Sequence, residues 1–185
     1  MRAFIAIDLD EAIKSELSAL VRRAARSRAE VRWVKLQGMH LTLKFLGEVS
    51  ADSDVARLEK ALRAAVQGTE RFELTLYGTG AFPDLHKPRV LWVGVKPCPA
   101  LDFLQGRVES FLEQEGFPRD ERPFKPHLTL GRVKGRSGLE SALGELRKNE
   151  TRTFGSMRVS RLSLFESRLK PDGAEYRVVS EIQIP

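Results

Sequence analysis

The chain has 185 residues, of which 42% are hydrophobic and 30% charged, a balance typical of a folded globular unit rather than a disordered chain. Its single cysteine, Cys98, excludes an internal disulfide framework and a cysteine-based zinc cluster, and no apolar run is long enough for a membrane-spanning helix. The net charge of +6 permits a polyanionic partner such as RNA without requiring one. The first residues lack the pattern of a signal peptide, so a cytoplasmic protein is expected.

Hydrophobic periodicity predicts alternating strands and helices along the chain. In the first half, the pattern indicates strands at 2–9, 31–34, 39–46 and 71–77, and helices at 11–25 and from Asp52 or Ser53 to Gly68. In the second half, it indicates strands at 90–93, 127–133, 157–166 and 175–184, and helices at about 99–115 and 138–148.

The two halves share more than this rhythm. The tetrapeptide His-Leu-Thr-Leu occurs at 40–43 and again at 127–130, an offset of 87 residues. An offset of 88 residues aligns Leu-Thr-Leu-Tyr at 74–77 with the similar Leu-Ser-Leu-Phe at 162–165. We therefore predict an internal duplication within a single domain, residues 1–185, made of two pseudo-symmetric lobes with repeat halves of roughly 1–87 and 88–185. The expected class is α+β, with two antiparallel sheets and helices on their outer faces.

The repeated tetrapeptide carries the candidate chemistry. Side chains alternate faces along a strand, so His40 and Thr42 share one face while the two leucines enter the core. His127 and Thr129 repeat this arrangement. If the two polar faces meet across a cleft, two imidazoles and two hydroxyls converge. Such a site could move protons on and off a phosphodiester without a metal, because one histidine can act as the base and the other as the acid.

Around these motifs, the whole chain resembles the two-histidine (2H) phosphoesterase superfamily. Within it, the chain is most similar to the bacterial and archaeal RNA 2',3'-cyclic phosphodiesterases, also called 2'-5' RNA ligases. The segments that carry this resemblance are RAFIAIDL at 2–9, RWVK at 32–35, HLTLKFLG at 40–47, RPFKPHLTLGR at 122–132, and Phe165-Glu166-Ser167 followed by Tyr176.

The resemblance implies a bilobal fold around a positively lined groove and hydrolysis of RNA 2',3'-cyclic phosphate ends to 2'-phosphates, with no metal and no cofactor. It implies RNA ends, such as those of tRNA fragments, or cyclic nucleotides as substrates, and the joining of RNA ends through a 2'-5' linkage as a related activity. Carried over, His40 is the proton donor, His127 is the proton acceptor, and Thr42 and Thr129 bind phosphate oxygens. The spacing alone leaves open which histidine is the acid, because the pair is nearly symmetric. A monomer is the default expectation.

Other residues near the motifs are candidates for substrate contacts. Alternation places Lys44 on the face of His40, as a phosphate contact or a charge at the groove rim. Arg132 falls on the opposite face from His127 unless a bend at Gly131 brings it back. Phe45 and Trp33 are candidates either for base stacking or for the core.

A second function class uses the same cleft. A non-catalytic module that binds nucleotides or RNA ends would need hydrogen-bond donors but no acid–base pair. The two intact histidines favour the enzyme.

Overall fold

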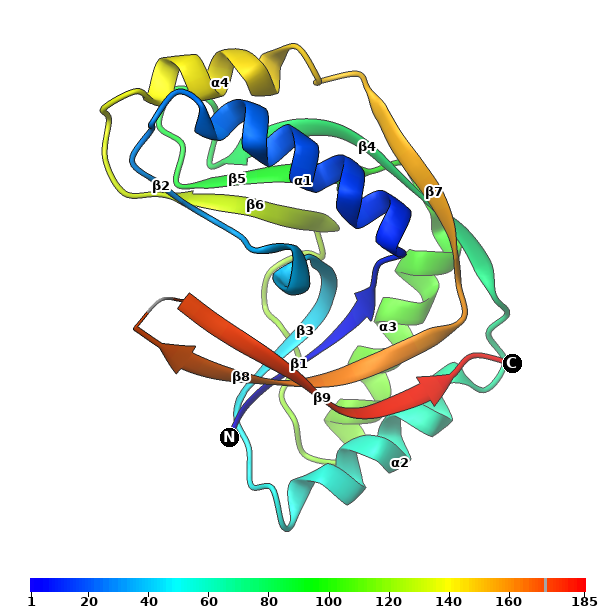
Figure 1. Ribbon diagram of the computed structural model, residues 1–185. Coiled ribbons are helices and arrows are strands. Elements are labelled where there is room, and N and C mark those ends of the chain that lie inside the picture. Colours follow the sequence, from blue (N-terminus) through cyan, green and yellow to red (C-terminus); the bar gives the residue numbers. More distant parts are fainter. Residues whose placement is uncertain (172) are drawn as a thin grey trace.

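The computed structural model describes residues 1–171 and 173–185, which form two antiparallel sheets (Figure 1). The first sheet has the strand order β3 (His40–Glu48), β1 (Arg2–Asp8), β8 (Arg161–Lys170), β9 (Gly173–Gln183). The second sheet has the order β2 (Val31–Trp33), β6 (His127–Val133), β5 (Val90–Val95), β4 (Phe72–Phe82), β7 (Thr153–Val159). A short 3₁₀ turn, η1 (Leu36–Gly38), leads from β2 of the second sheet to β3 of the first.

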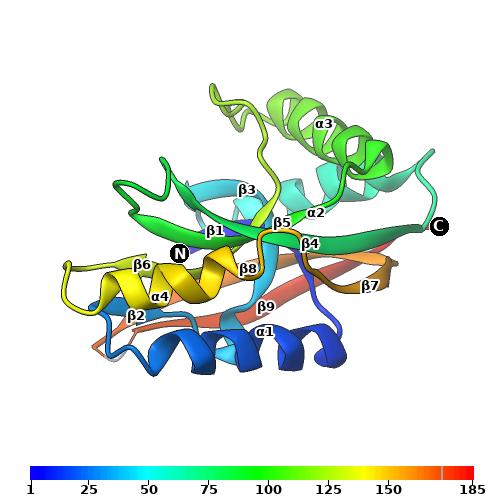
Figure 2. The ribbon, with the colours of Figure 1, turned by 90° about the horizontal axis from the view of Figure 1, so that it is seen from above.

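Each sheet is covered on one face by a pair of helices. The helices of the described residues are α1 (Glu11–Ala25), α2 (Asp54–Val66), α3 (Pro99–Gln114) and α4 (Leu139–Arg147). Helices α2 and α3 pack together and contact β9 and β3, whereas α1 and α4 pack together and contact β7 and β4. Figure 2 shows the two pairs on opposite sides of the molecule, with the strands between them. The predicted α+β class, with antiparallel sheets and helices outside, is confirmed.

The helices form where an apolar stripe recurs every three or four residues. In α1 the stripe consists of Ile13, Leu17, Leu20 and Ala24, all buried in the main core. Helix α3 begins at Pro99, a residue that suits a first helical turn because its missing N–H has no partner to lose there. This packing leaves the opposite face of each sheet free of helices. We call that opposite face the inner face.

Part of the strand order is repeated between the two sheets. An offset of 87 or 88 residues relates β3 to β6, β1 to β5 and β4 to β8, so the order β3-β1-β8 in the first sheet recurs as β6-β5-β4 in the second. Yet each sheet takes strands from both halves of the chain: β8 and β9 complete the first sheet, and β2 and β4 belong to the second. The halves 1–87 and 88–185 therefore do not each build one lobe. The periodicity of a strand specifies which face is buried but not which strand lies beside it.

Two of the predicted strands differ most from the structure. The segment 157–166, expected as one strand, contains the end of β7 and the start of β8, with a break at Ser160 where the chain passes from the second sheet to the first. Strand β4 continues past Tyr77 to Phe82.

In the described part of the chain, no helix is both long and apolar enough to cross a membrane.

Candidate active site

The two motif strands place their side chains as alternation predicts. In β3, Leu41 and Leu43 are buried in the main core, while His40 and Thr42 are half-buried on the inner face. In β6, the two leucines are buried and the histidine and threonine are half-buried in the same way. Strands β3 and β6 belong to different sheets but contact each other. The fold therefore brings the two motif-bearing strands into contact.

A β-bulge interrupts the alternation just after the first motif. Thr42 pairs with Ala6, but the next pair joins Lys44 to Ile5, so Leu43 is an extra residue in β3. Directly opposed residues share a face, and one extra residue reverses the faces of those that follow until the next register shift, which in β3 comes at Leu46. Lys44 therefore lies with Ile5 on the helix side, and Phe45 lies with Phe4 on the inner face.

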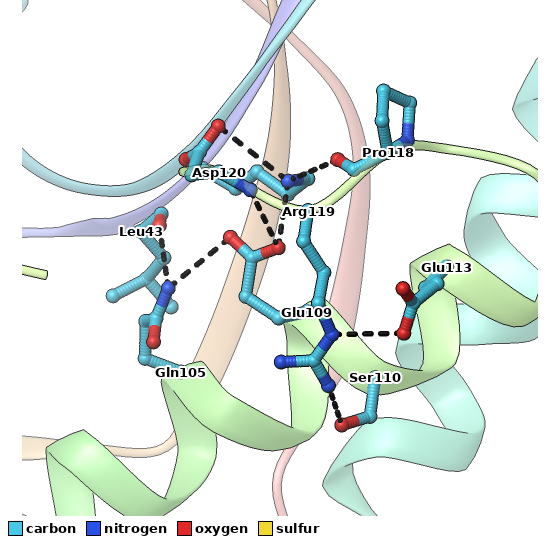
Figure 3. A network of polar contacts seen from close by, with 9 residues as sticks. Leu43, Gln105, Glu109, Ser110, Glu113, Pro118, Arg119 and Asp120 are labelled. Atoms are coloured by element: carbon cyan, nitrogen blue, oxygen red, sulfur yellow. Dashed lines mark hydrogen bonds and ion pairs between the residues drawn. The ribbon is translucent and has the colours of Figure 1, made fainter. Parts of the chain in front are cut away.

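The prediction that Lys44 shares the face of His40 is wrong, and the bulge is the reason. Lys44 is only 2% exposed, and its Nζ donates hydrogen bonds of 2.8 Å to Glu109 Oε2 and to the carbonyl oxygen of Pro118. Asp120 Oδ1 lies 3.7 Å from the same nitrogen. Figure 3 shows this network around the buried ammonium, between α3 and the segment that follows it. Lys44 thus neutralises an internal carboxylate and is not available to a phosphate.

The same network reaches the bulge itself. Gln105 Nε2 lies 3.5 Å from the carbonyl oxygen of Leu43 and 3.3 Å from Glu109 Oε1 (Figure 3). The backbone N–H of Asp120 also donates to Glu109, at 3.3 Å. Because the segment after Pro118 leads to β6, this cluster links the strand of His40 to the approach to His127.

Strand β6 has a bulge at the equivalent place. Thr129 pairs with Trp92 and Gly131 with Leu91, so Leu130, at an offset of 87 from Leu43, is the extra residue. The bulge returns Arg132 to the inner face, beside His127 and Thr129, where its side chain is exposed. Arg132 thus returns to the histidine face, an alternative that the sequence left open, and it does so through a bulge at Leu130 instead of a bend at Gly131.

Gly131 lies on the opposite face from Arg132, under strand β2. A Cβ atom there would lie 2.6 Å from Val31 Cγ1 and 2.9 Å from Trp33 Cε3, so no side chain fits. Trp33 itself packs against the main core, which favours the core interpretation of this residue over base stacking.

His40 lies in a cage of aromatic rings. Its ring stacks on Phe4 at 4.6 Å and on Phe165 at 5.4 Å, and Tyr176 meets it edge-on at 5.0 Å. Burial lowers the pKa of His40 to about 4; the Asp8 carboxylate, opposite it on β1, raises the pKa, and Lys14 lowers it. His40 is therefore neutral at pH 7 before substrate binds.

His127 has a polar anchor that His40 lacks. Its Nδ1 lies 2.7 Å from the carbonyl oxygen of Lys125, and Phe82 meets the ring edge-on at 4.8 Å. Because a carbonyl oxygen can only accept, Nδ1 carries the hydrogen and Nε2 of the neutral ring keeps its lone pair. Burial lowers the pKa of His127, the hydrogen bond to Lys125 raises it, and the charge of Arg132 lowers it.

Phe45 is well placed for contact with a ligand. It is 66% exposed on the inner face, and its ring centroid lies 6.0 Å from that of Phe4. The rings around the histidines, from Phe4, Phe82, Phe165 and Tyr176, were not predicted as site residues. Phe4 and Phe165 read as ordinary core positions, because the strand pattern does not reveal that they lie on the histidine face.

Two buried polar atoms of the described residues have no hydrogen-bond partner, Trp92 Nε1 and Ser163 Oγ. Trp92 pairs with Thr129, and its indole lies against Gly80, where a Cβ would come within 2.3 Å of the ring. Ser163 pairs with Ala6, which pairs in turn with Thr42. Buried polar groups are nearly always partnered, so these two atoms, in the same rows as the threonines, are exceptions among the described residues.

Other features lie apart from the motifs. A cavity of about 270 Å³ lies between the start of β4 and α3, lined by Gly68, Thr69, Glu70, Arg71, Phe72, Ala100 and Phe103. In the part of the chain that the structure describes, no three or more His, Cys, Asp or Glu side chains are grouped to hold a metal ion.

Comparison with known proteins assigns this arrangement to a family. The chain is 39% identical over 179 residues to the RNA 2',3'-cyclic phosphodiesterase of Methanothermobacter thermautotrophicus, covering 95% of both chains. It is 36% identical over 177 residues to that of Archaeoglobus fulgidus, covering 96% of this chain and 97% of the relative.

Solved structures agree with this assignment. A Thermus thermophilus protein superposes with a TM-score of 0.81 at 28% identity, over 100% of this chain and 98% of the other. LigT of E. coli complexed with 3'-AMP gives a TM-score of 0.72 at 28% identity, over 99% and 97%. The model of the 2'-5' RNA ligase superfamily matches residues 7–171. The chain belongs to the 2'-5' RNA ligase superfamily.

Proposed function

We propose that this protein hydrolyses the 2',3'-cyclic phosphate at the end of an RNA and leaves the phosphate on the 2' oxygen. The observation that carries the proposal is the pair of His-x-Thr strands, β3 and β6, which contact each other and hold both motifs on the inner faces. The names of the curated relatives support the same activity.

His127 is suited to accept a proton. Its Nδ1–H donates to the carbonyl oxygen of Lys125, which fixes the ring and leaves the Nε2 lone pair free. Water attacks phosphorus and transfers its proton to Nε2, while the bond between phosphorus and the 3' oxygen breaks. The hydrogen bond to the backbone helps to disperse the positive charge that the ring gains.

His40 donates the proton that the leaving 3' oxygen needs. Burial disfavours the imidazolium because it removes the ring from water, so the proton has to be drawn in by negative charge. The Asp8 carboxylate provides part of this charge. The anionic cyclic phosphate provides the rest when it binds, which couples protonation of His40 to the presence of substrate.

Thr42 and Thr129 donate hydrogen bonds to the non-bridging phosphate oxygens, and Arg132 adds positive charge on the same face as Thr129. The exposed ring of Phe45 offers a surface on which the terminal base stacks. These residues would line a positively charged groove between the sheets. The roles also explain why both motifs need a threonine two residues after the histidine.

The same acid and base would join RNA ends if a hydroxyl group replaced water, in the reverse of 2'-5' bond cleavage. RNA ends such as those of tRNA fragments, or free cyclic nucleotides, would be the substrates of a monomer acting in the cytoplasm. The nucleotide 3'-AMP in the E. coli LigT complex supports a nucleotide as ligand.

The test uses an oligonucleotide with a 2',3'-cyclic phosphate end, incubated in EDTA, with the position of the product phosphate mapped. We expect a 2'-phosphate. His40→Ala and His127→Ala should each lower kcat by about 10²–10⁴-fold. His86→Ala is the matched control, because His86 is exposed in a loop and lies outside both motifs.

The outcomes separate the two function classes. Tight binding of the oligonucleotide without turnover would support the non-catalytic binding module. A 3'-phosphate product would contradict the proposed leaving group. Activity lost in EDTA and restored by one metal would contradict the paired-histidine mechanism.

A further inference from the structure

One pair of facing charges in the sheets departs from the rest. Among the described strand pairs, carboxylates face arginines in Arg2–Glu48, Glu73–Arg158, Glu166–Arg177 and Arg168–Glu175. Arg32 of β2, in contrast, lies directly opposite Arg132 of β6. Like charges that face each other across two strands destabilise a sheet. The fold therefore maintains an unfavourable pair at this one place.

The pair lies beside the candidate active site. Directly opposed residues share a face, and the bulge at Leu130 puts Arg132 on the inner face with Thr129, so Arg32 is on that face too. Strand β2 is the edge of the second sheet, and both arginines are exposed. No ion pair with a described acidic residue engages either guanidinium. Arg132 is on the same strand as His127, the proposed base, and its charge lowers the pKa of that histidine.

Two unpaired guanidinium groups side by side are suited to bind an anion. Each presents planar, parallel N–H donors that match two oxygens of a phosphate, and an anion between them turns their repulsion into attraction. Neighbouring strands are only about 4.8 Å apart, so the two side chains can reach the same phosphate or adjacent ones.

The terminal nucleotide of the proposed substrate has two phosphates. One is the cyclic phosphate, held by the threonines, and the other is the phosphodiester at its 5' oxygen, which connects it to the rest of the RNA. A free cyclic mononucleotide lacks this second phosphate.

We propose that Arg32, together with Arg132, binds the phosphodiester on the 5' side of the terminal nucleotide and so selects RNA ends over cyclic mononucleotides. This inference rests on the proposed function, and it adds a specificity-determining residue to that site. Arg132 contributes next to the reacting phosphate, and Arg32 extends the contact to the open edge of the sheet.

The experiment compares a nucleoside 2',3'-cyclic phosphate with a dinucleotide that ends in the same group. For the unaltered protein we expect a lower KM for the dinucleotide. Arg32→Gln should raise the dinucleotide KM about 10-fold or more, the loss of one hydrogen-bonded charge contact, with kcat and the mononucleotide KM unchanged. Arg158→Gln on β7 is the matched control, since Arg158 is an exposed arginine of the same sheet that faces Glu73.

A binding measurement separates this inference from the proposed reaction. The affinities of a dinucleotide and a mononucleotide that both carry a terminal 2'-phosphate are measured without turnover. Arg32→Gln should weaken only the dinucleotide and reduce the slope of log affinity against log salt by about 0.7. Equal weakening of both ligands, or of neither, would overturn the role of Arg32. Absence of turnover in the unaltered protein would count against the proposed function alone.

Discussion

At the scale of single residues, the environments of the three histidines differ more than the sequence suggests. His40 lies among the rings of Phe4, Phe165 and Tyr176, and His127 is tied to a backbone carbonyl, while His86 is exposed. The sequence distinguishes His40 and His127 from His86, because only these two begin the repeated His-Leu-Thr-Leu segment. It could not predict the aromatic cage, because its members come from β1, β8 and β9, and their meeting depends on which strands are neighbours.

The burial of both histidines predicts an acid-shifted pH profile. Burial lowers the pKa of His40 to about 4 and also lowers that of His127, so both limbs of the kcat/KM bell should fall below the ordinary value of about 6.5. The limbs are macroscopic values of the pair. The Asp8 carboxylate raises the pKa of His40, whereas Lys14 lowers the pKa of His40 and Arg132 lowers that of His127. A bound phosphate anion also raises the pKa of an imidazole, so both limbs of the kcat profile should move to higher pH.

The measurement is kcat and kcat/KM between pH 4 and pH 9 on one substrate. A kcat/KM that rises steadily across this range would indicate a hydroxide-like nucleophile instead of the histidine pair. A kcat profile shifted to lower pH than kcat/KM would contradict the coupling of His40 protonation to the substrate charge.

The same burial predicts a loss of stability in acid. The folded pKa of His40, about 4, lies below the unfolded value of 6.5, so between these values the unfolded chain binds more protons. The contribution is fully present above pH 6.5 and is lost as the pH falls toward 4, up to about 3 kcal/mol. His40→Phe, which keeps an aromatic ring in the cage, should flatten this dependence in urea unfolding at pH 7.5 and 4.5. An unchanged difference between the two pH values would show that His40 is not protonated on unfolding.

At the scale of elements, the two bulges decide which residues face the site. Alternation predicts the faces correctly up to Leu43 in β3 and Leu130 in β6, and fails for the residues directly after each. A bulge depends on the register between two strands, so a single strand pattern does not reveal it. The two bulges are at equivalent positions, 87 residues apart. The first puts Phe45 on the inner face in place of Lys44, and the second puts Arg132 there in place of Gly131.

The buried ion pair under the first bulge predicts a large and asymmetric effect on stability. Glu109→Leu removes the main charge partner of Lys44 and leaves its ammonium buried, which should cost about 3–5 kcal/mol in urea unfolding. The double variant with Lys44→Met removes both charges and should recover most of this loss.

Glu113→Leu, on the same helix but half exposed and paired with Arg119 at the surface, is the control and should change stability by less than about 1 kcal/mol. A double variant as unstable as Glu109→Leu alone would show that shape, and not charge, holds this contact.

At the scale of the whole molecule, each sheet is assembled from strands of both halves of the chain. Helix α1 follows β1 of the first sheet but covers the second, and α3 follows β5 of the second but covers the first (Figure 1). Strands β4 and β8, equivalent in the repeat, each complete the sheet begun by the other half. The connections therefore pass repeatedly between the lobes, and each lobe depends on both halves of the chain.

This exchange predicts that the halves cannot fold apart but can fold together. Consider a split after Lys87, in the exposed loop between β4 and β5. Fragment 1–87 would contain β1 and β3 of the first sheet but lack β8 and the covering helix α3. It would contain β2 and β4 of the second sheet but lack β5 and β6, which lie between them. The main core takes residues from both halves of the chain, so each fragment alone would expose apolar side chains that the other half buries. Neither fragment should therefore show a cooperative unfolding transition. Mixed or co-expressed fragments should associate and regain one transition, because every missing strand then finds its partner.

The comparison is made by circular dichroism of each fragment and of the mixture in a urea series. A cooperative transition for fragment 88–185 alone would mean that β5, β6 and their helices form a self-sufficient lobe, and that the exchanged strands are not needed for folding.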